Sequence, residues 1–266
     1  ILTIFERRVK DQDLPFFLKL MKSTQNAGVD CPTPIVNKQG EYLGFVKKKK
    51  FAFFKFLEGS NLKYWNQNDC FLVGKKISDF HIANKNFEIK KNNDFGINQF
   101  LSLFYKIEEG LEIFLPGLKE NIKKEIIFLK KKYPRNVSCG IIHADLFPDN
   151  ILFFKKNISG IIDFYFSCYD YFIYDLSIAI NAWCFPNNKF DQKNYKSLMK
   201  GYLENSYLSD EEFSNFNIFL RAAAMRFLLT RLSDIIFPTS NSAEKKDPKE
   251  FFNILNFHRI NDITKE

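Results

Sequence analysis

Two short apolar runs that each lead to an aspartate constrain this chain more than any other feature. The first belongs to Ile141-Ile142-His143-Ala144-Asp145, and an asparagine, Asn150, follows five residues after that aspartate. The second is Ile161-Ile162-Asp163. Short runs of β-branched residues bounded by turn residues are typical of buried strands. We therefore expect a β-hairpin formed by residues 151–154 and 159–162, with polar groups at strand ends, where a cleft can form.

This spacing is that of a kinase catalytic loop and its metal-binding aspartate, where catalysis depends on positioning and charge neutralisation. We expect Asp145 to accept or orient the proton of an acceptor hydroxyl. Asn150 and Asp163 are the expected Mg²⁺ ligands that face the ATP phosphates. We also place His143 in the catalytic set, where it more readily braces the loop than acts as a base. A lone His-x-Asp is common by chance, whereas the combined pattern is far more specific.

The composition fits a globular protein of one or two domains, with 266 residues of which 45% are hydrophobic. The net charge is +8, but Lys, Asn, Ile and Phe are abundant throughout, which indicates a general compositional bias. We therefore expect neither nucleic acid nor membrane as a partner, and no apolar run is long enough to span a bilayer. The run Lys47-Lys48-Lys49-Lys50 is expected at the tip of a hairpin, as a solvated turn.

The cysteines and histidines point to no disulfide scaffold and no zinc site. The five cysteines are scattered and include no Cys-x-x-Cys pair, and the three histidines lie far apart. This usage favours a reducing, cytoplasmic location. The chain begins at Ile1 inside an expected strand and has no initiator methionine, so we interpret it as lacking an N-terminal portion.

Turn and cap signals divide the chain into a β-rich part, 1–57, and a mostly helical part, 58–266. In the first part we expect a helix from Asp13 through Asn26, ending at Gly28, and strands over 1–5, 35–36, 42–46 and 51–56. In the second part we expect His81 to pack in the core, and helices over 68–84, 99–114, 118–132, 171–183, 192–205, 210–237 and 246–257.

The segment between the two parts has two interpretations. Phe56, Leu57 and Glu58 follow the last strand of the small part and precede the first long helical pattern. In a two-lobed kinase this segment is the hinge, and its backbone would bind the adenine edge of ATP. The alternative is a plain strand-to-helix linker.

Several segments together resemble the aminoglycoside phosphotransferase–choline kinase superfamily, and within it the bacterial homoserine kinases of this fold. The stretches His143-Ala144-Asp145-Leu146-Phe147-Pro148-Asp149-Asn150 and Asn181-Ala182-Trp183-Cys184-Phe185 are specific to that branch. The matching segments run from one end of the chain to the other, at residues 2–9, 13–18, 31–34, 142–150, 160–166, 174–178, 181–185 and 226–232.

The resemblance implies an α+β, two-lobed, protein-kinase-like fold, with an incomplete β-rich N-lobe and a larger, mostly helical C-lobe. It implies transfer of the γ-phosphoryl group of ATP, with Mg²⁺, to the hydroxyl of L-homoserine, on the route to threonine. Asp145 would be the base, Asn150 and Asp163 the magnesium ligands. Asp175 would brace the catalytic loop from the following helix; otherwise it is a surface residue at a helix end.

Two departures from the superfamily concern the ATP phosphates. Thr3 stands where a lysine on the third strand of the small lobe is usual, and the helix at Pro15 to Lys22 offers no glutamate to pair with such a lysine. The hairpin that should cover ATP would lie before Ile1. The group that clamps the phosphates is therefore unassigned.

The amino-acid acceptor needs partners for a carboxylate and an ammonium group. Arg226 and Arg231 lie on a late helix with a buried face, where an arginine needs a partner, so they are carboxylate candidates. An ion pair with Asp175 or Asp234 is an equal alternative for them. The remaining candidates for the pocket are Tyr165, Asp170, Asn181 and Trp183, of which Trp183 fits a core position better.

Two other functions remain open from the sequence. The chain could phosphorylate another small alcohol, such as choline or an aminoglycoside, although an aminoglycoside would call for an acidic cleft. It could also be a non-catalytic kinase fold that serves as a binding module, as Thr3 suggests. Intact Asp145, Asn150 and Asp163 argue against the second alternative. The oligomeric state is not specified by the sequence.

Overall fold

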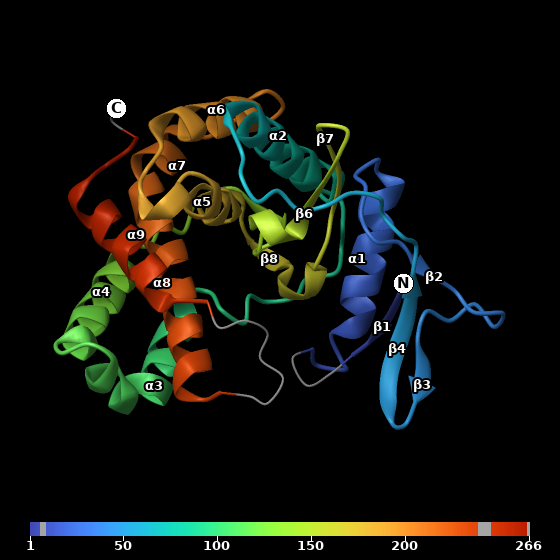
Figure 1. The fold of residues 1–266 in the computed structure, drawn as a ribbon, viewed down its shortest axis with the longest axis horizontal. Coiled ribbons are helices and arrows are strands. Elements are labelled where there is room, and N and C mark those ends of the chain that lie inside the picture. The colour runs from blue at the N-terminus through green and yellow to red at the C-terminus, as the bar shows by residue number, and fades with distance from the viewer. Residues whose placement is uncertain (6–8, 239–245, 265–266) are drawn as a thin grey trace.

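The computed structural model describes residues 1–5, 9–238 and 246–264, and it has two lobes (Figure 1). A small antiparallel sheet with one helix forms the N-terminal lobe, and helices form most of the larger one. The α+β, two-lobed prediction is therefore confirmed. Residues 6–8, which belong to one of the segments that carry the resemblance, lie outside the described residues.

The small lobe is built around its longest strand, β4 (Lys49–Phe54), which pairs antiparallel with the three other strands. Ala52 and Phe54 are buried, whereas Phe53 between them is half exposed, so only one face of the sheet belongs to the core. Helix α1 (Leu14–Asn26) lies beside the sheet (Figure 1). The other strands are β1 (Leu2–Ile4), β2 (Pro34–Ile35) and β3 (Gly44–Val46).

Local signals placed these elements well, with two corrections. Helix α1 starts after Asp13 as predicted, but the Asp13 side chain makes no capping hydrogen bond, and its carboxylate lies 3.6 Å from Lys91. Only two of the four consecutive lysines form the predicted turn. Lys47 and Lys48 have positive φ and form the turn, while Lys49 and Lys50 already belong to β4.

The larger lobe packs its helices around α8 (Phe216–Ile236), most of whose residues are buried. The expected single helix over 210–237 is wrong, because the chain breaks at Asn215 into α7 (Asp210–Ser214) and α8. The other helices are α2 (Gln67–Ala83), α3 (Phe100–Phe114), α4 (Leu118–Lys132), α5 (Phe172–Trp183), α6 (Gln192–Leu203) and α9 (Pro248–Ile260). Short 3₁₀ turns lie at Ile97–Gln99, Pro148–Asn150, Phe164–Phe166 and Pro186–Asn188.

Two two-stranded antiparallel sheets interrupt the helices. The predicted hairpin is present, with β6 (Ile151–Phe154) antiparallel to β7 (Asn157–Ile161). Strand β5 (Cys139–Ile142), also expected, pairs with β8 (Cys168–Tyr171), which the sequence did not reveal.

The β6–β7 hairpin is hydrogen-bonded to segments of the chain that precede the helical lobe. The backbone of Ser60 pairs with Phe153 through two hydrogen bonds of 3.0 and 2.9 Å. The N–H of Ile161 donates to the carbonyl of Asp30, after α1, at 3.0 Å. Our proposed boundary at residues 57 and 58 lies between the end of β4 and this contact at Ser60.

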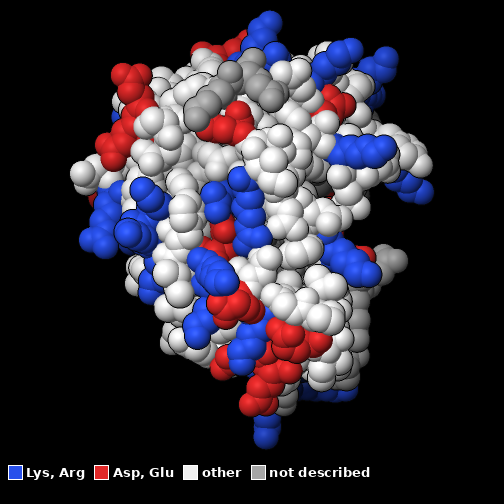
Figure 2. All heavy atoms as spheres, turned by 90° about the vertical axis from the view of Figure 1, so that its left-hand side faces the viewer, with Lys and Arg blue, Asp and Glu red and all other residues white. Residues whose placement is uncertain are grey.

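The surface does not segregate charge on the face of the helical lobe that Figure 2 shows, where basic and acidic residues are interspersed. Within the described residues, no helix is both long enough and apolar enough to cross a membrane.

A buried histidine predicts how stability depends on pH. His258 of α9 is 1% exposed, and burial lowers its pKa from 6.5 to about 3. Between these two values the unfolded chain binds a proton that the folded chain does not, so stability falls as the pH falls. This group should remove about 2 kcal/mol from the free energy of unfolding between pH 7 and pH 5.

Urea unfolding at the two pH values measures this contribution. The variant His258→Gln should lose about 2 kcal/mol less on acidification than the parent, because glutamine does not titrate. Equal losses in the two proteins would contradict the assignment.

Candidate active site

The three residues of the sequence motif converge at the end of the β6–β7 hairpin. The side-chain amide of Asn150 donates to the backbone carbonyl of Asp145 at 2.7 Å and to its carboxylate at 2.8 Å. The N–H of Ile162, the residue before Asp163, donates to the carbonyl of Asn150 at 2.9 Å. Asp163 is exposed and adopts a left-handed conformation with φ of 62°. The hairpin therefore brings the two loop residues beside the second aspartate.

The carboxyl of Asp145 lies in a setting that disfavours its charged form. Burial raises its pKa to about 6, the Arg226 guanidinium opposes the rise, and the negative charge of Asp163 adds to it. A carboxyl with this pKa is still ionised at neutral pH and is a stronger base than an ordinary aspartate. Such a group suits proton transfer from an alcohol.

The donor set at this place fits a magnesium ion that arrives with a nucleotide. Because the amide nitrogen of Asn150 is committed to Asp145, its amide oxygen is left for a metal, beside the exposed carboxylate of Asp163. Across the described residues, no cluster of three or more His, Cys, Asp or Glu side chains could hold a metal alone. Mg²⁺ needs no such cage, since it takes phosphate and water oxygens beside one or two protein ligands.

A buried aspartate holds the start of the catalytic loop. One oxygen of Asp175 accepts the backbone N–H of Ala144 at 2.7 Å, and the other accepts that of His143 at 2.9 Å. Burial alone would raise the pKa of Asp175, but the hydrogen bond from His81 and the loop around His143 hold it below the usual value. Ala144 has a φ of 64°, a strained conformation that these bonds help to maintain.

His143 has the geometry of a brace and not that of a base. It is fully buried, and its Nε2 atom donates to the carbonyl of Ile162 at 3.0 Å. Burial lowers its pKa to about 4, so the ring is neutral at neutral pH. The hydrogen bond joins the first residue of the loop to Ile162, which lies between the end of β7 and Asp163.

Comparison with known proteins places this site in a family. Residues 1–196 match the phosphotransferase enzyme family, known as APH. The chain belongs to that family. It is 39% identical over 260 residues to the homoserine kinase of Parvibaculum lavamentivorans and 41% identical over 261 residues to that of Agrobacterium fabrum. Each match covers 97% of this chain and 81% of the relative.

Solved structures of other phosphotransferases share the fold. An amicoumacin kinase superposes with a TM-score of 0.71 at 16% identity, over 99% of this chain and 80% of its own. A spectinomycin phosphotransferase superposes with a TM-score of 0.65 at 14% identity, over 99% and 83%. These likenesses confirm the kinase-like architecture of this phosphotransferase.

The sequence missed two side chains that hold the catalytic loop of the phosphotransferase. Nε2 of His81 lies 3.0 Å from Asp175, so this histidine is buried as predicted but also supports the aspartate behind the loop. The side-chain amide of Asn61, from the segment after β4, donates to the carbonyls of Pro148, Asp149 and Ile151 at 3.2, 2.8 and 3.2 Å. No local signal marks either residue, because each contacts the loop only in the folded chain.

Three of the predicted substrate residues use their polar atoms inside the protein, a correction to that prediction. Trp183 is fully buried and its indole N–H donates to the carbonyl of Leu146 at 2.9 Å. Asn181 donates to the carbonyl of Leu220 at 2.9 Å and accepts from the His258 ring. Arg231 forms an ion pair with Glu250, on α9, and not with either predicted aspartate.

The contacts of Arg226 favour a structural role in the loop over binding of the substrate carboxylate. The residue is 1% exposed, and its guanidinium donates to the carbonyl of Ala144, next to Asp145, the candidate base. The charge lies 4.6 Å from the centre of the Phe227 ring. Among the described residues Arg226 forms no ion pair with Asp175 or Asp234, the alternative that the sequence left open.

The remaining candidates are only partly buried. Asp170 accepts the side-chain amide of Asn93 and the N–H of Tyr171, both at 2.8 Å. The Tyr165 ring meets Phe5 and Phe17 of the small lobe edge to face. The predicted hinge, Phe56 to Glu58, lies between the end of β4 and Ser60. The side chain of Phe56 is 70% exposed.

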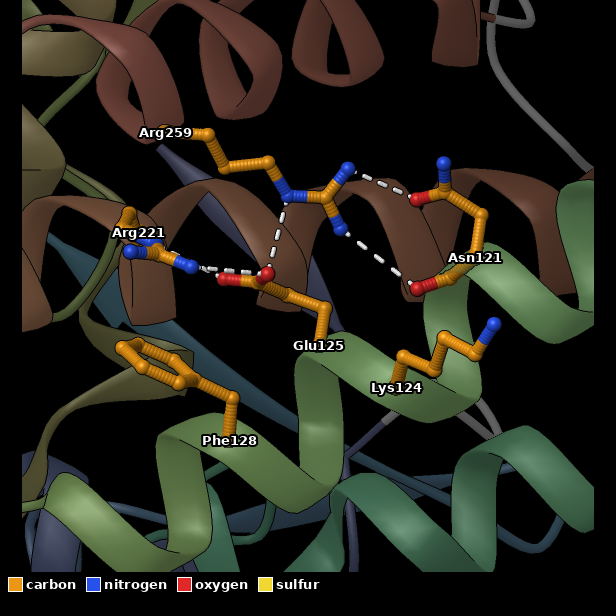
Figure 3. A pocket seen from close by; sticks show the side chains of 6 residues that line it. All are labelled: Asn121, Lys124, Glu125, Phe128, Arg221 and Arg259. Atoms are coloured by element: carbon orange, nitrogen blue, oxygen red, sulfur yellow. Dashed lines mark hydrogen bonds and ion pairs between the residues drawn. The ribbon is translucent and has the colours of Figure 1, made fainter.

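A surface hollow of about 310 Å³ lies away from the catalytic loop, between α4, α8 and α9 (Figure 3). Among its lining residues, Glu125 is 5% exposed. Its carboxylate accepts two hydrogen bonds of 2.8 Å from Arg221 and one of 2.8 Å from Arg259. Arg259 also reaches the side chain of Asn121. The three charges join three helices, so we interpret the hollow as a structural ion cluster.

Substitution of Glu125 tests that interpretation. The variant Glu125→Gln should lower the free energy of unfolding by about 1–3 kcal/mol, because two partly buried arginines lose their counter-charge. Turnover by the folded fraction should not change. The matched control is Glu120→Gln, whose ion pair with Lys124 is exposed and should cost well under 1 kcal/mol. Equal effects of the two variants in chemical denaturation would contradict the structural role.

Proposed function

We propose that this phosphotransferase is a homoserine kinase, which transfers the γ-phosphoryl group of ATP to the hydroxyl of L-homoserine. The observation that carries the proposal is 39–41% identity to homoserine kinases over 97% of the chain. The product would be O-phospho-L-homoserine. The cytoplasm suits this reaction and the five free cysteines.

In the proposed reaction, Asp145 accepts the proton of the substrate hydroxyl as that oxygen attacks the γ-phosphorus. The bond between the γ-phosphorus and the β–γ bridging oxygen breaks, and ADP leaves. Asn150 fixes the position of this carboxylate, since it donates to one of its oxygens. A magnesium ion, held by Asp163 and Asn150, would supply the charge neutralisation that the phosphates need. Asp175 binds the start of the loop, and His143 ties the loop to Ile162, the residue before Asp163.

For the substrates we propose fewer contacts than the sequence suggested. The backbone of Phe56 to Glu58 would bind the adenine edge, because this segment connects the small sheet to Ser60, which pairs with the β6–β7 hairpin. Asp170 would attract the ammonium group of homoserine, and Tyr165 would line the pocket. Arg226 would act on the acceptor site through the Ala144 carbonyl.

Release of ADP by the purified protein tests the function. The assay supplies Mg-ATP with L-homoserine, and in parallel with L-serine, L-threonine, choline and an aminoglycoside. Turnover with homoserine at least tenfold above every other alcohol supports the proposal. Faster turnover with another alcohol would keep the phosphotransferase and reject homoserine, and no turnover with any of them would favour the non-catalytic binding module.

A further inference from the structure

Lys246 is a cation that reaches the catalytic loop from a distant part of the chain. It precedes α9, and its ammonium group pairs with the carboxylate of Asp149. Asp149 stands in the loop between Asp145 and Asn150. The same ammonium group lies 5.3 Å from the centre of the Phe147 ring. A positive charge is therefore held over the segment that joins the proposed base to a proposed metal ligand.

The pair is built so that it can exchange partners. The side chains of Lys246 and Asp149 are 52% and 56% exposed. An exposed ion pair of this kind contributes little to stability, so its exchange for another anion costs little. Lys246 also acts on Asp145, because its charge helps to lower the pKa of that carboxyl against the effect of burial.

The reaction requires cations, and in the described part of the small lobe a threonine stands where the resemblance predicts a lysine. Thr3 lies in β1, opposite Ala52, at the position where the superfamily usually has a lysine. Arg226, the other cation that acts on Asp145, is buried and donates to the Ala144 carbonyl. Preorganised cations at the transferred phosphoryl group are a main source of catalysis in this chemistry.

We propose that Lys246 is a substrate-binding residue. Its ammonium group gives up the ion pair with Asp149 and binds an anionic oxygen of a substrate. Two sources of that oxygen share the chemistry, a phosphate group of ATP and the carboxylate of the amino-acid acceptor. The inference rests on the proposed function and adds a residue that recognises one of its two substrates.

The experiment compares Lys246→Met with the parent protein, with Lys246→Arg and with Lys75→Met. Lys75 is the matched control, since it also makes a partly exposed ion pair, with Glu204 at 2.9 Å, on another part of the surface. The measurements are kcat, KM for ATP and KM for homoserine. Calorimetric titration with ATP, in the presence of Mg²⁺, adds a readout that is independent of turnover.

We expect kcat/KM of Lys246→Met to fall by about tenfold to a hundredfold, the loss of one charge-assisted contact, with partial recovery in Lys246→Arg. A higher KM for ATP, with weaker ATP binding, would assign the oxygen to a phosphate group. A higher KM for homoserine alone would assign it to the carboxylate. A fall in kcat alone would assign the anionic oxygen to the phosphoryl group during its transfer.

Kinetics of Lys246→Met that match those of Lys75→Met would overturn the inference. The parent protein separates this result from failure of the proposed function. If the parent turns over homoserine and Lys246→Met does so equally well, only the inference fails. If the parent does not turn over homoserine, the proposed function fails, and the ATP titration still decides whether Lys246 contacts phosphate.

Discussion

Replacement of Asp145 by asparagine should reduce kcat by roughly 10²–10⁴-fold, the contribution expected of a general base. The amide has nearly the same shape as the carboxylate, and its oxygen can still accept the hydrogen bond that Asn150 donates. The loop should therefore keep its conformation, and the loss should fall on proton transfer. ADP release measures kcat, and titration with ATP checks that nucleotide binding survives.

The control for this variant is Asp234→Asn, the same change at an exposed position of α8. It should leave kcat within about twofold of the parent, since surface substitutions have small effects. If Asp145→Asn retained more than a tenth of the parental kcat while folded, Asp145 would not be the base.

Replacement of Asp175 by alanine should produce the largest loss of stability, about 3–5 kcal/mol. The carboxylate is fully buried, and its two oxygens serve the backbone N–H groups of His143 and Ala144 and the ring of His81. Alanine would leave these buried donors without an acceptor, and it would release the strained backbone at Ala144. Activity should fall as well, because the next residue is the proposed base.

Denaturant unfolding of Asp175→Ala, Asp175→Asn and the control Asp234→Ala measures the loss. Asparagine should restore part of the stability, because it supplies one acceptor oxygen in the same volume. A loss below 1 kcal/mol in Asp175→Ala would show that the aspartate does not support the loop. Since the folded pKa of Asp175 is lowered, its contribution is complete above pH ~3.9 and disappears as the pH falls through the folded value.

Most elements of the fold could be predicted from local patterns. Helix α4 and strand β6 have the predicted bounds, whereas the second strand of the hairpin spans Asn157–Ile161 and not the predicted 159–162. Strand β8 could not be predicted from its local pattern, because its partner β5 lies far away in the chain, with Cys139 opposite Tyr171 and Ile142 opposite Cys168. The break at Asn215 was missed because apolar periodicity continues on both sides of it.

In the candidate site, too, the residues with a local sequence pattern could be predicted and the residues that meet only in the folded chain could not. Asp145, Asn150 and Asp163 belong to a single stretch of 19 residues, so their spacing is visible in the sequence. The supports of the loop come from far away, with separations of 94 residues between His81 and Asp175 and 88 between Asn61 and Asp149. Asn181 was offered as a pocket residue because the sequence does not show that its side chain is bonded to the Leu220 carbonyl and the His258 ring.

The β6–β7 hairpin links the thermodynamics of the two lobes. Its backbone is hydrogen-bonded to Ser60, after the small sheet, and to Asp30, after α1, and it ends at Ile161, two residues before Asp163. Loss of the small lobe would remove hydrogen bonds from the element that precedes Asp163, the proposed metal ligand. The molecule should therefore melt as one cooperative unit, and a nucleotide bound at Asp163 should raise the melting temperature of both lobes together.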